Sequence, residues 1–319
     1  MTEPDARTAA LNFYDQHYDS MVCHLHSNTD RRVLGDRENQ VCRFCGKSRP
    51  EVRFRDRAHA IPESLGNRVL FTNYECDTCN RFFGETIEND FGKWSKPYRL
   101  FARIRGKNGV PTLKGLGWRI EHNASTGFCI KQTKNSLPFV FDEEKKQIRF
   151  EFEREPYSPI AVLKTFIKIG LTLLPVAELP NFSEALAWIR EPDHTKSCGV
   201  WQGPAIKTFQ PGPTPSDLVV ILLRRKTSVT GVPYAFLVVA YGDHTFQAYL
   251  PSPKQDSAIY GRDMEIRPLP TPYKDNPLYG NARVEPLDVY ERTASIVLGF
   301  EQIEDQDLEL LRKYSRKIL

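Results

Sequence analysis

The sequence predicts an α+β protein, in which a small cysteine-rich module precedes a larger mixed α/β domain of unassigned fold. Three observations lead to this prediction. Four of the seven cysteines form two closely spaced pairs, at positions 42 and 45 and at positions 76 and 79. Residues 31–120 carry a net charge of +9, whereas residues 1–30 carry −4 and residues 121–319 carry −1. Most of the 23 prolines lie beyond residue 118, where the composition changes. We therefore divide the chain into residues 1–40, 41–118 and 119–319.

The composition excludes several protein classes. With 40% hydrophobic and 26% charged residues among 319, the chain is neither disordered nor fibrous and can bury a substantial core. The most apolar stretch, Ile160–Leu174, contains two lysines and is shorter than the ~20 residues that a bilayer span requires. The acidic, polar start of the chain differs from a signal peptide. We expect a cytoplasmic protein.

The first segment, residues 1–40, is predicted to be a helical lead-in followed by a charged bridge. Leu11, Tyr14 and Tyr18 recur at helical spacing, and the helix is expected to extend to about residue 30. The bridge then leads into the first cysteine pair.

The two cysteine pairs predict a zinc site. A tetrahedral zinc ion takes four soft ligands, and two Cys-x-x-Cys turns brought together by folding supply them as Cys42, Cys45, Cys76 and Cys79. The alternative is four unrelated buried thiols, which this regular spacing disfavours. The other three cysteines stand alone in the sequence, which is typical of small buried hydrophobic residues.

The segment after the second cysteine pair predicts a helix and a basic hairpin. Phe82, Phe83, Ile87 and Phe91 have the spacing of one amphipathic helix over residues 78–94. Basic residues then surround a Gly-Lys-Asn-Gly turn at 106–109, where we expect a hairpin.

The last segment, residues 119–319, predicts helices and strands but no chemistry. Pro159 suits the first turn of a buried helix over 160–174, and Asn181 is expected to cap a helix over 181–190. Apolar runs at 218–223, 234–241 and 245–250 predict strands. A charged amphipathic helix is expected over 305–319.

Between and after the cysteine pairs, the sequence resembles a known enzyme family. Residues 58–67, Ala-His-Ala-Ile-Pro-Glu-Ser-Leu-Gly-Asn, and residues 75–84, Glu-Cys-Asp-Thr-Cys-Asn-Arg-Phe-Phe-Gly, are similar to the HNH endonucleases that have a four-cysteine zinc site. The resemblance covers about residues 41–110. It implies a ββα-metal (treble-clef) active site that hydrolyses DNA, with His59 as general base and with Asn80 as a ligand of a catalytic Mg²⁺ or Mn²⁺.

The chemistry of these residues agrees with the resemblance. A histidine with a pKa near 6.5 can deprotonate water near neutral pH, and His59 is the sole histidine between the cysteine pairs. Its alternative role is structural, as a hydrogen-bond partner of a loop. The side chain of Asn80 could instead cap the helix that it begins.

The sequence does not identify the second ligand of the expected catalytic metal. The family often carries an acid directly before the histidine, but this chain has Ala58 there. Asp56, Asn73 and Glu88 are the candidates. We favour Glu88, because its phase on the expected helix is close to that of Asn80.

The basic residues of the same segment are expected to contact phosphates, which would position DNA without reading its sequence. They could instead form a solvated basic surface. The residues are Arg53, Arg55, Arg57, Arg99, Arg103, Arg105 and Lys107.

The expected function is therefore a DNA endonuclease, and the resemblance suggests a role in host defence or in a mobile element. The alternatives are an RNA-directed nuclease and a zinc-finger nucleic-acid-binding protein with a degenerate site, which Ala58 would favour. The oligomeric state is not predicted.

Overall fold

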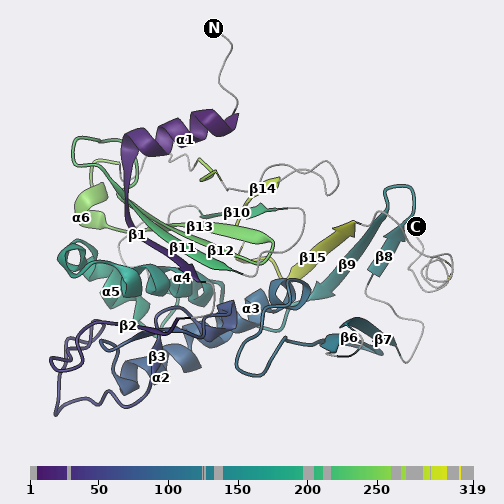
Figure 1. The fold of residues 1–319 in the computed structure, drawn as a ribbon, viewed down its shortest axis with the longest axis horizontal. Coiled ribbons are helices and arrows are strands. Elements are labelled where there is room, and N and C mark those ends of the chain that lie inside the picture. The colour runs from purple at the N-terminus through teal and green to yellow at the C-terminus, as the bar shows by residue number, and fades with distance from the viewer. Residues whose placement is uncertain are drawn as a thin grey trace, which may run out of the picture.

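A computed structural model describes residues 6–26, 30–123, 125, 127–132, 139–196, 205–210, 217–259, 267–270, 283–287, 289–299 and 309. Figure 1 shows an antiparallel sheet, helices packed beneath it, and a smaller module beyond those helices. The prediction of an α+β fold with a small cysteine-rich module is confirmed.

The largest element is a six-stranded antiparallel sheet with the strand order β1-β11-β12-β13-β10-β14. Its two central strands are buried along almost their whole length, because helices cover one face and the N-terminal segment covers part of the other. The strands are β1 Tyr18–His26, β11 Leu218–Arg225, β12 Ala235–Tyr241, β13 His244–Leu250, β10 Ala205–Phe209 and β14 Arg283–Pro286. The three strands predicted from apolar runs are confirmed as β11, β12 and β13.

Helix α4, Pro159–Leu173, packs on β12 and β13 as the predicted buried helix. Its Gly170 allows this close approach, because a Cβ atom there would lie 2.5 Å from a methyl carbon of Leu250. The next helix differs from its prediction. The chain first forms a 3-10 helix, η2 Val176–Phe182, and α5 begins at Ser183 and ends at Ile189. Asn181 is therefore no helix cap, and its amide instead donates to Glu178 and Tyr234.

The N-terminal prediction is wrong beyond residue 17. Helix α1 spans Ala6–His17, and the chain then continues as β1, the edge strand that pairs with β11. The aromatic residues read as one helical stripe pack in both elements, with Tyr14 and Tyr18 beside Phe236 of β12. Burial of these rings on the sheet overrides the helical spacing.

The cysteine-rich module contains a three-stranded sheet with the order β2-β4-β3, formed by Arg32–Leu34, Leu70–Thr72 and Ala58–His59. A one-turn 3-10 helix, η1 Glu63–Leu65, lies between β3 and β4. The single helix expected over 78–94 is in fact two, α2 Asp77–Glu85 and α3 Ile87–Phe101. The backbone at Thr86, with φ −109° and ψ −94°, separates them.

Two further three-stranded antiparallel sheets complete the described fold. Gly106 and Gly109 form the expected turn, but it closes on a single bridge, and the regular hairpin starts later, at Leu113. The strands are β5 Leu113–Gly115, β6 Trp118–Asn123, β7 Gly127–Gln132, β15 Thr293–Gly299, β9 Gln147–Glu153 and β8 Phe139–Asp142. One short helix, α6 Pro253–Asp256, follows β13.

The module and the six-stranded sheet share one hydrophobic core. Phe91 and Trp94 of α3 are fully buried and contact Phe166 of α4, with ring centroids 5.2 and 5.9 Å apart. Trp94 also contacts Phe246 of β13. The boundaries at residues 40 and 118 stay predictions, and this packing crosses the second of them.

The helix expected over 305–319 lies outside the described residues, except for Glu309. In the part of the chain that the structure describes, no helix combines the length and apolar character needed to span a bilayer.

Candidate metal centre and catalytic site

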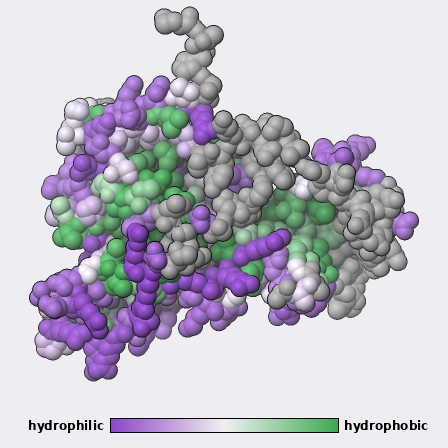
Figure 2. All heavy atoms as spheres, in the orientation of Figure 1, coloured by the Kyte–Doolittle hydropathy of each residue, from purple (hydrophilic) through white to green (hydrophobic). Residues whose placement is uncertain are grey.

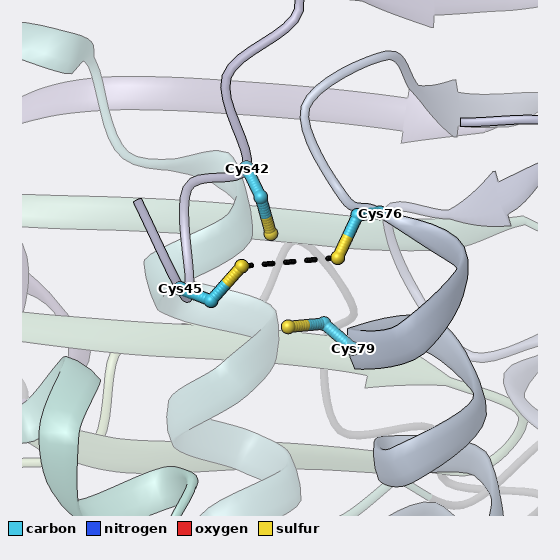
Figure 3. A group of neighbouring side chains, drawn as sticks. All are labelled: Cys42, Cys45, Cys76 and Cys79. Atoms are coloured by element: carbon cyan, nitrogen blue, oxygen red, sulfur yellow. Dashed lines mark hydrogen bonds between the residues drawn. The ribbon is translucent and has the colours of Figure 1, made fainter. Parts of the chain in front are cut away.

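The four predicted cysteines converge on one point (Figure 3). All four Sγ atoms lie within 4.8 Å of one another, and those of Cys45 and Cys76 are 3.8 Å apart. A tetrahedral ion with Zn–S bonds of about 2.3 Å separates its ligands by roughly 3.8 Å. The four thiols therefore fit a single zinc ion.

The local backbone explains why the four thiols converge. Gly46 adopts φ +73° and donates to the carbonyl oxygen of Cys42, which closes the first turn. Cys76 is the N-cap of α2 and Cys79 lies in its first turn, so both sulfur atoms point away from the helix start (Figure 3).

The thiols perturb one another strongly. The hydrogen bond from Cys79 lowers the pKa of Cys42 to about 4, whereas burial raises the pKa of Cys76 to about 11. Four thiols so close together, three of them buried, cannot all ionise without a compensating cation. A divalent ion bound by four thiolates supplies that charge.

The first cysteine turn is attached to the end of α4. The guanidinium of Arg43 donates to the carbonyl oxygens of Leu171, Thr172 and Leu174, at 2.6–2.9 Å. Its plane lies over the ring of Tyr74, whose hydroxyl also donates to Thr172. These contacts satisfy carbonyl groups that would otherwise lack partners at the helix end.

His59 lies at the end of β3, and its backbone pairs with Phe71 of β4. The imidazole is half-buried and contacts the Phe71 ring, with centroids 4.7 Å apart. Within the described residues it has no hydrogen-bond partner, so a ring nitrogen is free to accept a proton. The neighbouring Ala58 is fully buried, so the position where the family often carries an acid is inside the core here.

Burial lowers the pKa of His59 below its usual value of about 6.5. The carboxylates of Glu63 and Glu88 oppose this shift, and the ammonium group of Lys168 adds to it. The imidazole is therefore neutral at pH 7, which is the state that a general base requires.

Asn67 is a residue whose role the sequence did not reveal. Its side chain is completely buried, and Nδ2 donates to the carbonyl oxygens of Ile61 and Leu70, at 2.8 and 2.9 Å. Its Oδ1 accepts from the backbone N–H groups of Val69 and Leu70. Asn67 thus fixes the loop that joins β3 to β4. Only its place in the His-x-x-Pro…Asn motif marks it in the sequence.

The two predicted metal ligands lie on different helices. Asn80 is half-buried in α2, and within the described residues its side chain makes no hydrogen bond. Glu88 is in α3, beyond the break at Thr86, so the argument from a common helical phase does not hold. Glu88 is nevertheless close enough to His59 to shift its pKa.

The other two ligand candidates differ in their surroundings. Asp56 is exposed, and its backbone N–H donates to Asp77 in the first turn of α2. The side chain of Asn73 donates to the carbonyl oxygen of Gly35, at 3.3 Å. Within the described residues, no contact holds the side chain of Asp56 or Asn73 beside His59.

The basic residues fall into two groups. Six are exposed, whereas Arg99 is half-buried and donates to the carbonyl oxygen of Gly92 in its own helix. Arg53, Arg55 and Arg57 alternate in the sequence as the residues of a strand would, but the structure places them on the loop before β3. Figure 2 shows hydrophilic side chains covering the end of the molecule where Figure 1 places the module. The exposed residues are Arg53, Arg55, Arg57, Arg103, Arg105 and Lys107.

Comparison with known families agrees with this geometry. A family model described as HNH endonuclease matches residues 42–95, from the first zinc cysteine to the core of α3. No curated protein and no solved structure matches the chain. The resemblance seen in the sequence is therefore confirmed for this segment, because residues 42–95 match the HNH endonuclease family.

Proposed function

We propose that the protein is a metal-dependent HNH endonuclease that hydrolyses phosphodiester bonds of DNA. The observation that carries this proposal is the state of His59, a neutral, half-buried imidazole without a hydrogen-bond partner among the described residues. It lies on a strand that is fixed by Asn67 and belongs to the same module as the zinc cysteines.

In this proposal, His59 accepts the proton of the attacking water, a role typically worth about 10²–10⁴ in rate. The β3–β4 pairing places His59 beside Phe71, whose ring packs against the imidazole. The side chains of Asn80 and Glu88 offer the amide and carboxylate oxygens that Mg²⁺ or Mn²⁺ prefers. When bound, such an ion polarises the phosphate and offsets the charge that develops on it.

The zinc site supports the catalytic residues without taking part in the reaction. Four thiolates fill the coordination sphere of zinc and leave no position for water or substrate, as in structural sites. The exposed arginines of the 53–57 loop and the basic residues after α3 supply phosphate contacts on the same module. They favour a nucleic-acid substrate.

Cleavage of supercoiled plasmid tests the proposal. The zinc-loaded protein is expected to nick DNA with added Mg²⁺ or Mn²⁺ and not without it, and His59→Ala should lower the rate about 10²–10⁴-fold. Zinc content and circular dichroism should be unchanged. His17→Ala, a substitution on α1 outside the module, serves as the control and should cleave normally.

Two outcomes would contradict the proposal. If His59→Ala cleaves at the wild-type rate, the general base lies elsewhere. If the wild-type protein binds DNA tightly but never cleaves it with either ion, the module is a binding module with a degenerate site. A parallel assay with RNA of the same sequence distinguishes the two substrates.

A further inference from the structure

A cluster of one lysine and two glutamates, Lys168, Glu75 and Glu88, joins the module to α4. The ammonium nitrogen of Lys168 lies 3.1 Å from Oε2 of Glu75 and 2.9 Å from Oε1 of Glu88. The side chains of Lys168 and Glu75 are 1% and 0% exposed. Lys168 therefore reaches the nuclease module from outside the matched segment 42–95.

The surroundings of Lys168 are otherwise apolar. Its ammonium group lies over the rings of Phe44 and Phe83, at 5.8 and 5.3 Å from their centroids. Burying a charge in such a place is costly, and a well-packed hydrophobic side chain is often at least as stabilising as a buried ion pair. Stability alone therefore gives a weak reason for a lysine here.

The geometry of Glu88 suggests what the lysine does. One carboxylate oxygen, Oε1, accepts the hydrogen bond from Lys168. Within the described residues the other oxygen has no hydrogen-bond partner, and the side chain is 22% exposed. A carboxylate fixed through one oxygen and open at the other is the usual arrangement of a metal ligand oriented by an outer partner.

Glu75 completes the arrangement. Its carboxylate is the second contact of the ammonium group, and Glu75 directly precedes Cys76 of the cysteine cluster. The cluster thus connects the second cysteine turn, α4 and Glu88, the acidic ligand candidate whose charge acts on His59.

We infer that Lys168 is a positioning residue of the nuclease site, which holds Glu88 in place as a ligand of the divalent metal. The inference rests on the proposed function and adds that α4, from outside the family segment, completes the site. Removing an outer partner of a metal ligand typically weakens metal binding about 10–100-fold.

Binding of Mn²⁺ tests the inference without relying on cleavage. The experiment uses the full-length, zinc-loaded chain carrying His59→Ala, with uncleaved DNA present, and measures the Mn²⁺ dissociation constant by electron paramagnetic resonance. Lys168→Met is expected to raise that constant 10–100-fold at unchanged zinc content. Lys164→Met is the matched control, because Lys164 is equally buried one turn earlier in α4 but donates to the carbonyl oxygen of Glu191.

A double-mutant cycle shows whether Lys168 acts through Glu88. In a Glu88→Ala background, Lys168→Met should weaken Mn²⁺ binding no further. Equal losses in Lys164→Met and Lys168→Met, or wild-type Mn²⁺ binding by Lys168→Met, would overturn the inference.

A second variant keeps the inference testable if Lys168→Met fails to fold. Glu88→Asp preserves the carboxylate charge but is too short to reach Lys168 and the metal together, so it should also weaken Mn²⁺ binding 10–100-fold. Unchanged binding by Glu88→Asp would overturn the inference. Cleavage that depends on His59 but is insensitive to Lys168 would defeat the inference alone. Lys168-dependent Mn²⁺ binding without any cleavage would defeat the proposed nuclease.

Discussion

The zinc module and the six-stranded sheet are stabilised in different ways. The strands of the module have two or three residues each. Its loops are fixed by directed contacts: the hydrogen bonds of Asn67, those of Asp77, and the cluster of four thiols that fits one metal ion. The strands β11, β12 and β13 have seven or eight residues, and every residue of β13 is buried.

This difference has a physical reason. Strands so short bury little apolar surface of their own, so the position of His59 depends on bonds with fixed direction and length. The sheet gains its stability from burial, which is non-directional and tolerates exchange of one apolar residue for another. The proposed catalytic group, His59, therefore lies in the region whose geometry depends most on directed contacts.

Loss of zinc should have the largest effect and should separate the two regions. Apparent binding free energies of structural zinc are about 10–16 kcal/mol, so Cys79→Ser should unfold the module. Hydrogen exchange is expected to show loss of protection in β3, β4 and α2 with protection retained in β12 and β13. Elemental analysis should find about one zinc per wild-type chain. Cys129→Ser should change neither result, and a folded, zinc-free module would refute the site.

A cavity in the shared core should affect both regions together. Phe166→Ala removes a fully buried ring that contacts Phe91, Trp94 and Phe246, and we expect a loss of about 3–5 kcal/mol in the free energy of unfolding. Urea unfolding followed by Trp fluorescence measures it. Leu11→Ala, at a side chain 49% exposed, is the control. A loss of stability confined to one of the two regions would show that the Phe166 ring does not couple them.

Asn67→Ala tests whether the directed hydrogen bonds of one residue in the module position His59. It removes hydrogen bonds to buried backbone groups, and each group left unsatisfied costs about 1–3 kcal/mol. Cleavage should fall while the zinc content stays near one, because the cysteines are unaffected. Asn89→Ala, at an exposed position of α3, should leave both unchanged. Normal cleavage by Asn67→Ala would mean that the loop does not position His59.

The basic surface of the module should account for the salt dependence of DNA binding. Each lost phosphate contact reduces the slope of log affinity against log salt by about 0.9, so Arg103→Ala with Arg105→Ala should flatten it by nearly two units. Lys145→Ala with Arg149→Ala removes the same charge from β9 and the turn before it and should leave the slope unchanged. If both pairs weaken binding equally, the effect is one of total charge.

The pH dependence of cleavage should show the smallest change. Because burial lowers the pKa of His59, the imidazole becomes protonated at a lower pH than an ordinary histidine. The acid limb of the rate profile should therefore have its midpoint below pH 6.5. Glu63→Gln removes a carboxylate that raises this pKa, so the midpoint should move to still lower pH. Gln255→Ala, outside the module, is the control. NMR titration of His59 measures the same pKa directly, and an upward shift would contradict the assignment.

The sequence allowed good prediction of the zinc site and of the central strands. The spacing of the cysteines alone identifies the four candidate ligands of a metal. The apolar runs of β11, β12 and β13 are long enough that a buried sheet strand is the structure they favour. The two helices α2 and α3 were predicted as one, because the apolar spacing continues across Thr86 although the backbone does not.

Other features depend on partners far away in the chain. The strand β1 was predicted as helix, because Tyr18 continues the helical spacing of Leu11 and Tyr14 and because the strand that pairs with β1 lies near residue 220. Lys168 was seen merely as an interruption of an apolar helix. Its contacts with Glu75 and Glu88 come from the tertiary fold, which local patterns do not contain.

The pairing of β1 with β11 has a consequence for how the protein is made. A ribosome that has just released His26 must add about 200 residues before Leu218 is available, which at roughly 5–20 residues per second takes some 10–40 s. During that time the zinc ligands and α4 have already emerged, so the module can bind its metal first. Until β11 has been synthesised, β1 has no partner strand, and chaperones would bind the unpaired segment of the nascent chain during this time.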